Sequence, residues 1–183
     1  ASQWRARPLP ADEVTVFRAT ANDLDINPIV AHASYLINLA APNPALRQRS
    51  INALTDELDR GDALGLLGVV LHPGSYTTGT EESGLRLVAE AINEVFATRG
   101  AGTQLLLEHT AGQGTNLGHQ FEHLATIING TSVKERLGVC LDTCHLLAAG
   151  YDIATLDGYS RTFDDFETHV GLDRLQLLHL NDS

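Results

Sequence analysis

Four apolar segments of the sequence each end abruptly at a histidine or a carboxylate. They are Leu66–Leu71 before His72, Gln104–Leu107 before Glu108, Leu137–Leu141 before Asp142, and Leu175–Leu178 before His179. Short and almost wholly apolar runs are typical of parallel strands buried on both faces. A fifth segment, Asn27–Ala31 before His32, has a shorter apolar centre, and we predict a strand there as well.

The five end residues follow one another at intervals of 40, 36, 34 and 37 residues, which is the length of one strand with one helix each time. Helical patterns fill these intervals at Pro44–Asp59, Glu81–Arg99, Leu117–Ile128 and Leu156–Val170. Strands that alternate with helices predict an α/β fold with a parallel sheet and right-handed crossovers. No linker or low-complexity tract interrupts the pattern, so residues 1–183 are predicted to form a single domain.

The number of strands leaves two architectures open. A closed (β/α)8 TIM barrel needs eight such units, or roughly 250 to 300 residues, whereas the chain supplies five units. The pattern therefore predicts either an open doubly wound sheet or the central fragment of a TIM barrel that is truncated at both ends. In the second case, the first two strands and the last strand lie outside the sequence.

The charge and the cysteines limit the class of protein. A formal net charge of -11 argues against adhesion to nucleic acid through lysine and arginine alone, although bound divalent cations would reverse the local sign. No apolar run is long enough to span a membrane and no secretory signal begins the chain, so a cytoplasmic protein is expected. Cys140 and Cys144 are expected to be reduced thiols.

The strand-end residues are all of types that bind metal ions. In parallel α/β proteins the carboxyl ends of the strands gather at one site, so five such residues in register predict convergence. The predicted ligands, which include one residue just beyond a strand, are His32, His72, Glu108, Asp142, His145 and His179. Imidazoles and carboxylates suit zinc, manganese or iron, and a bridging Glu108 would suit more than one ion. Such a site favours hydrolysis of a phosphoester.

Four other residues have competing interpretations. Cys144 is predicted to pack as a small apolar side chain rather than to act as a ligand or nucleophile. His119 and His123 have the spacing of a zinc-binding pair on a predicted helix, but we favour a solvated or capping role for them. His109 is equally compatible with orienting a ligand and with an ordinary place in a loop.

Five motifs resemble the endonuclease IV family over nearly the whole chain. They are His32–Leu39 (HASYLINL), His72–Ser75 (HPGS), Leu107–Gly114 (LEHTAGQG), Gly138–His145 (GVCLDTCH) with Ala149–Asp152 (AGYD), and His179–Asp182 (HLND). The resemblance implies a TIM barrel that holds three zinc ions and cleaves duplex DNA on the 5′ side of abasic sites during base-excision repair. Manganese is a second candidate metal.

The resemblance also implies roles for single residues. His32, His72 and Glu108 would hold the first ion, Glu108, Asp142 and His179 the second, and His145 the third. The catalytic role falls on the bridging Glu108. Tyr35 and Leu36 would press into the minor groove and help to push out the abasic nucleotide. Two positions depart from the family pattern: His109 replaces the usual Asn, and Ser2 replaces an Arg that usually contacts DNA.

Three functions are compatible with the sequence. The first is the abasic-site endonuclease, which would act as a monomer when complete and need neither a membrane nor an obligate protein partner. The second is a metal-dependent sugar isomerase or epimerase, because related barrels bind divalent ions at the same strand ends. The third is an inactive fragment whose exposed strand edges favour association. The segment after His32 and the Asp142–His145 segment favour the endonuclease.

Overall fold

The sheet consists of five parallel strands. The computed structural model describes residue 4 and residues 7–181, so the departure at Ser2 and the last position of the final motif, Asp182, lie outside the described residues. The strands are β1 (Val30–His32), β2 (Gly68–Leu71), β3 (Gln104–Glu108), β4 (Leu137–Asp142) and β5 (Leu175–His179). All five predicted strands are confirmed, although β1 and β2 begin later in the chain than predicted.

The strand order decides between the two predicted architectures. Neighbours in the sheet are also neighbours in the sequence, in the order β1-β2-β3-β4-β5, and every pair is parallel. A doubly wound sheet reverses its strand order at a switch point, whereas a TIM barrel adds each new strand on the same side. The described strands therefore form an arc of a barrel.

Four helices correspond to the predicted ones, with changed ends. They are α2 (Pro44–Leu64), α3 (Glu81–Phe96), α4 (Phe121–Asn129) and α6 (Leu156–His169). The side chain of Asn43 caps α2, and Thr80 forms a capping box with Ser83 at the start of α3. The prediction that α4 begins at Leu117 is wrong, because Gly118 has a φ of 95° and lies in a loop instead.

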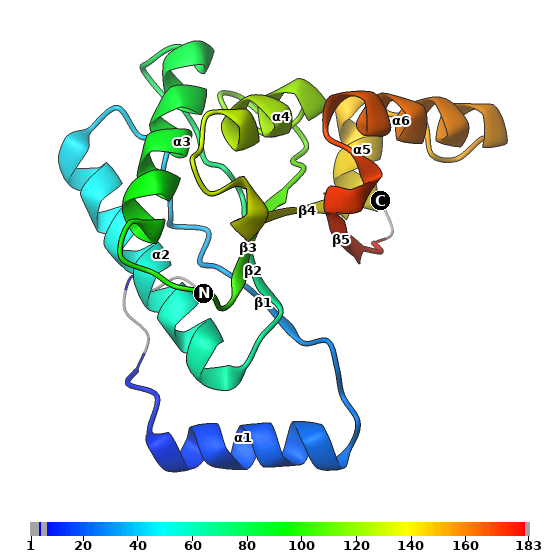
Figure 1. The fold of residues 1–183 in the computed structure, drawn as a ribbon. Helices are drawn as coiled ribbons and strands as arrows, with labels where there is room; N and C mark the ends of the chain where they lie inside the picture. Colours follow the sequence, from blue (N-terminus) through cyan, green and yellow to red (C-terminus); the bar gives the residue numbers. More distant parts are fainter. Residues whose placement is uncertain (1–3, 5–6, 182–183) are drawn as a thin grey trace.

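Two further helices were not predicted from the sequence. Helix α1 (Ala11–Asp23) has no buried residue, so its sequence lacks the apolar stripe that identifies a core-facing helix. It lies at the edge of the molecule, next to the carboxyl end of α2 (Figure 1). Helix α5 (Thr143–Ala149) starts directly where β4 ends, and two short 3-10 helices, Lys134–Arg136 and Leu172–Arg174, precede β4 and β5.

The two faces of the sheet are packed differently. The outer face contributes Val69, Leu105 and Val139 to the large core beneath the helices. The inner face carries a separate apolar cluster of Val70, Leu106 and Cys140, all fully buried, with Val30 and Leu177 packed against it. Each of these five inner residues precedes a strand-end histidine or carboxylate by two positions. Because side chains alternate along a strand, the predicted ligands point to the same inner side.

Small residues make room for this inner cluster. A Cβ atom added to Gly68 or Gly138 would lie 2.8 Å from a side-chain atom of Leu106 in the neighbouring strand. Gly138 in β4 is paired directly with Leu106, whereas Gly68 in β2 is paired with Gln104 and lies diagonally from Leu106. A large central side chain between two glycines fills the barrel interior below the strand ends without overpacking.

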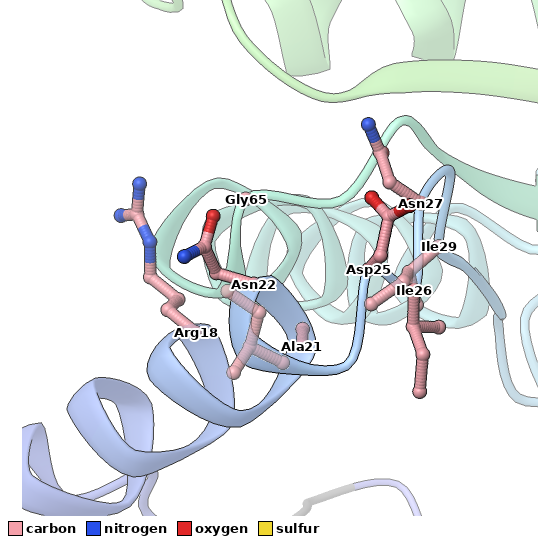
Figure 2. Close-up of a pocket in the computed structure, with 9 residues that line it drawn as sticks. Arg18, Ala21, Asn22, Asp25, Ile26, Asn27, Ile29 and Gly65 are labelled. Carbon is pink, nitrogen blue, oxygen red and sulfur yellow. The ribbon is translucent and has the colours of Figure 1, made fainter.

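A hollow of about 370 Å³ lies at the opposite end of the strands from the predicted ligands, near the amino ends of β1 and β2. Figure 2 shows its lining. The residues come from α1, from the loop before β1 and from the end of α2, and they are Arg18, Ala21, Asn22, Asp25, Ile26, Asn27, Ile29, Leu64 and Gly65. In TIM barrels this end contributes to stability, whereas the carboxyl ends of the strands carry the chemistry.

Candidate metal centre

A buried carboxylate forms the middle of the predicted site. Glu108 ends β3, the central strand, and only 1% of its surface is exposed. Its Oε2 lies 2.8 Å from Nε2 of His32, the last residue of β1, and 3.0 Å from Nε2 of His72, which follows β2. Its Oε1 lies 3.0 Å from Nδ1 of His179 and 3.5 Å from Nδ1 of His145. Each oxygen therefore faces its own pair of imidazoles.

The hydrogen bonds of His32 test whether a metal ion fits this arrangement. Nδ1 of His32 lies 2.7 Å from the carbonyl oxygen of Ala33, so Nδ1 must be the protonated nitrogen. In the neutral ring, Nε2 then presents a lone pair to Oε2 of Glu108, and two acceptors face each other at 2.8 Å. Such a pair needs a cation between its atoms, either a proton or a metal ion. The donor set therefore fits a divalent metal.

His145 has the same backbone support. Its Nδ1 lies 2.8 Å from the carbonyl oxygen of His109, which fixes the proton on Nδ1 and leaves Nε2 as the nitrogen that can bind an ion. The ring sits in the first turn of α5, where Asp142 is the N-cap and its Oδ1 accepts a hydrogen bond of 3.0 Å from the His145 backbone. The turn places both predicted ligands at the same strand end.

The second oxygen of Asp142 lies on the β5 side of the site. It is 3.7 Å from Nδ1 of His179 and accepts a hydrogen bond from the side-chain amide of Asn181. The Thr143 hydroxyl accepts a hydrogen bond of 2.9 Å from the Asn181 backbone nitrogen. These contacts hold the segment after β5 against the start of α5 and orient the Asp142 carboxylate. The sequence interpretation did not assign Asn181 a role, although it lies in the His179–Asp182 motif.

The histidines strongly favour the ionised form of Glu108. Burial of the carboxyl acts to raise its pKa, but the hydrogen bonds and positive charges of His32 and His72 outweigh burial and hold the pKa of Glu108 well below its usual range. Burial likewise opposes a charge on His32, yet its bonds to Glu108 and Ala33 raise the pKa of that imidazole above its ordinary value. The contacts of the centre thus stabilise the charged form of the Glu108 carboxyl.

The structure brings the potential ligands together in groups that differ in part from those that the resemblance implies, because Asp142 groups with His145 rather than with His179. Among the described residues, donor atoms within 4.8 Å of one another occur in the sets His32–His72–Glu108, Glu108–Asp142–His145 and Glu108–Cys140–His179. Burial raises the pKa of the Cys140 thiol far above its usual value, which disfavours the thiolate that a metal ligand requires. Cys144 is half-buried in α5 and belongs to none of these sets.

The two interpretations of His109 are resolved by its contacts. The side chain is fully buried, and its Nε2 donates to the carbonyl oxygen of His119 at 3.1 Å. Burial lowers the pKa of His109 to about 4, so the ring is neutral. The backbone carbonyl oxygen of His109 accepts a hydrogen bond from Nδ1 of His145, so His109 supports the site through its backbone. Its side chain holds the following loop through the hydrogen bond to His119.

Tyr35 and Leu36 lie beside the centre. The Tyr35 side chain is 69% exposed, and its ring centroid lies 5.0 Å from that of His32 and 5.2 Å from that of His72. Leu36 is partly exposed. An exposed aromatic ring above two potential ligands is available to a substrate rather than to the core.

The prediction that His119 and His123 share one helix is wrong. His119 lies in the loop before α4, and His123 lies in the first turn of that helix. The solvated role is also wrong for His123, which is only 3% exposed. Their ring centroids are 4.7 Å apart, and neither residue belongs to the sets around Glu108.

Comparison with known proteins gives a consistent picture. A family model described as xylose isomerase-like TIM barrel matches residues 1–183. The chain is 50% identical over 182 residues to "Probable endonuclease 4" of Chloroflexus aurantiacus. This alignment covers 99% of this chain and 64% of that protein. The chain is 45% identical over 183 residues to a protein of the same name from Citrifermentans bemidjiense, covering 100% of this chain and 65% of the relative. The chain thus spans somewhat less than two thirds of these relatives.

The solved structures agree. Endonuclease IV from Thermus thermophilus aligns with a TM-score of 0.85 at 40% identity, over 99% of this chain and 63% of that chain. D-psicose 3-epimerase from Clostridium cellulolyticum aligns with a TM-score of 0.71 at 22% identity, over 95% of this chain and 59% of the epimerase. The epimerase shares the fold alone. The barrel arc and the predicted resemblance to endonuclease IV are confirmed. In addition, no helix among the described residues is long and apolar enough to cross a membrane.

Proposed function

The chain belongs to the family of xylose isomerase-like TIM barrels, and from that premise we propose that it carries the core of a zinc-dependent DNA-repair endonuclease. The proposed reaction is hydrolysis of the phosphodiester bond on the 5′ side of an abasic site in duplex DNA, as in base-excision repair. The observation that carries the proposal is the buried Glu108 carboxylate, whose two oxygens each face two imidazoles. The similarity to proteins named endonuclease 4 supplies the substrate class.

In this proposal Glu108 bridges the metal positions. His32 and His72 complete one position through Oε2, and His179 and Asp142 complete a second position on the side of Oε1. His145 offers its Nε2 to a third. Zinc ions bound there would polarise the phosphate oxygens and lower the pKa of water. The same ligand atoms could bind manganese, although sites rich in imidazole favour zinc.

The remaining residues of the site would recognise the substrate. The Glu108 and Asp142 carboxylates alone would repel a phosphate, so the proposal requires the cations to supply the positive charge that this acidic chain lacks. The exposed Tyr35 ring and Leu36 would enter the minor groove and occupy the stack where the base is missing. Extrusion of a nucleotide costs least at a damaged position, which provides selectivity for abasic sites. Such an enzyme would act as a monomer in the cytoplasm.

Sugar isomerisation is a weaker proposal, since the epimerases share the fold at low identity. The test is incision of a duplex with one abasic-site analogue by the folded, zinc-loaded chain. We expect cleavage 5′ to the lesion that a chelator abolishes and that an undamaged duplex does not undergo. Turnover of a ketose without incision would favour the isomerase. No incision would contradict the proposal that this segment carries the activity.

A further inference from the structure

A second group of potential metal ligands lies outside the proposed centre. Glu81 at the start of α3, His119 in the loop before α4, and His123 in α4 place one donor atom each within 4.8 Å of one another. None of the three follows a strand, and the group shares no residue with the sets around Glu108. The sequence interpretation found the two histidines but not the carboxylate, because Glu81 is 38 residues away from His119 along the chain.

His119 is already oriented as a ligand. Its Nδ1 lies 3.1 Å from the carbonyl oxygen of Asn116, which fixes the proton on Nδ1. The lone pair on Nε2 is then available. A backbone carbonyl that accepts from the other ring nitrogen is the usual support of a metal-bound histidine.

His123 brings an unsatisfied buried atom to the same place. The side chain is 3% exposed, and its Nε2 has no hydrogen-bond partner among the described residues. The nearest acid is Glu81, whose Oε1 lies 3.3 Å from this Nε2, outside good hydrogen-bond geometry. A buried nitrogen that faces a carboxylate without a well-aligned hydrogen bond is incompletely satisfied, and a cation between the two atoms would satisfy both.

We propose that Glu81, His119 and His123 bind a single divalent cation of the zinc class. Two imidazoles and one carboxylate are a ligand set that zinc accepts, with water in the fourth position. The half-exposed Glu81 carboxylate leaves the ion accessible from solvent. The cation would join the start of α3, the loop before α4 and the first turn of α4.

One contact makes this site weaker than the proposed centre. The backbone nitrogen of Gly118 donates to Nδ1 of His123 at 3.2 Å, so without an ion the neutral ring carries its hydrogen on Nε2. An ion on Nε2 requires that this hydrogen move to Nδ1 through solvent, and the Gly118 amide must then turn away. The ion therefore replaces one hydrogen bond, and zinc should bind here with lower affinity than at Glu108.

The second site connects to the proposed centre through His109. The carbonyl oxygen of His119 accepts from the side chain of His109, and the carbonyl oxygen of His109 accepts from Nδ1 of His145. An ion on His119 would hold this loop in place and so help to fix the orientation of His145. The inference concerns binding and does not depend on the reaction proposed for the centre.

Competition with a chromophoric zinc chelator tests the inference on the full chain. His119→Gln and Glu81→Gln alter side chains that are not buried, so both variants should fold like the parent, as judged by circular dichroism. We expect each to lose the weakest zinc equivalent, with its affinity reduced by at least about tenfold. The stronger equivalents at Glu108 should remain.

His169→Gln is the matched control. His169 in α6 also lies within 3.5 Å of two carboxylates, those of Glu122 and Asp165, but it belongs to no set of three potential ligands among the described residues. It should retain every zinc equivalent of the parent. Identical stoichiometry and affinity in His119→Gln, Glu81→Gln and His169→Gln would overturn the inference.

Discussion

The clusters around Glu108 and around Glu81 contain the same types of residue but differ in how the protein supports them. Around Glu108 the carboxylate is buried, and the carbonyl oxygens of Ala33 and His109 set the protons of His32 and His145. Around Glu81 the carboxylate is half-exposed, and one of the two rings, His123, accepts a backbone hydrogen bond instead. Because the backbone orients the rings at Glu108 but competes for one ring at Glu81, we expect the Glu108 centre to bind metal more tightly than the Glu81 cluster.

The largest expected effect distinguishes the two carboxylates. Glu108→Gln keeps the shape of the side chain but removes the charge that four histidines surround. We expect zinc affinity at the centre to fall by a factor on the order of a hundred or more, and incision of abasic DNA to be lost. Glu81→Gln is the matched change in the other cluster and should leave the tight equivalents unchanged. Equal losses in the two variants would break the comparison.

The next effect concerns the support of Asp142. Asn181→Ala removes the amide that donates to Oδ2 of Asp142 but leaves the predicted ligands in place. Loss of a group that orients a ligand typically reduces metal affinity by about tenfold or somewhat more. Zinc titration should show this decrease at the centre, whereas the Glu81 cluster should be unaffected. Unchanged affinity would mean that Asn181 does not position Asp142.

A smaller effect separates substrate binding from metal binding. Tyr35→Ala removes an exposed ring that stands over His32 and His72 without being a ligand. Stacking of an aromatic side chain on a base contributes about 1–3 kcal/mol, so incision should fall by about tenfold at limiting DNA. Zinc stoichiometry and the free energy of unfolding should stay within error. A parallel loss of zinc would show that Tyr35 acts on the centre itself.

The smallest effect is a pH dependence from the second cluster. Burial lowers the pKa of His123 below its ordinary value of about 6.5. In mild acid the His123 side chain therefore binds a proton in the unfolded chain but not in the folded chain. The free energy of unfolding should therefore fall as the pH falls from about 7.5 to about 5.5.

His123→Gln removes this contribution and should make the pH dependence shallower, while the contribution of the buried His109, of the same sign, remains. Urea unfolding in the presence of a chelator, at the two pH values, measures the difference between the variant and the parent. If His123→Gln has the same slope as the parent, His123 does not contribute to the acid sensitivity.

The strands and the centre could be predicted because both follow from simple alternation. Apolar runs marked the strands, and a polar residue two positions beyond an inner apolar residue, such as Glu108 after Leu106, must face the same side. The strand order added what the sequence left open, since five units suit either an open sheet or an arc of a barrel.

Helix α1, the Glu81 cluster and the burial of His123 could not be predicted, because they depend on contacts between residues that are far apart in the sequence or on the absence of an apolar pattern. Helix α1 buries no residue and so has no apolar period to detect. Glu81 joins His119 only because α3 and the loop before α4 come together in space. The buried position of His123 follows from the packing of α4, which the sequence placed four residues too early.

Anomalous diffraction at the zinc edge shows directly whether Glu108 bridges two metal positions. Crystals of the chain grown with zinc should show one peak near each oxygen of Glu108, at roughly 2.0–2.2 Å. The peak on the side of Oε2 should lie within bonding distance of His32 and His72, and the other within bonding distance of His179. Zinc-loaded crystals without a peak at either oxygen would show that Glu108 does not bridge metal ions.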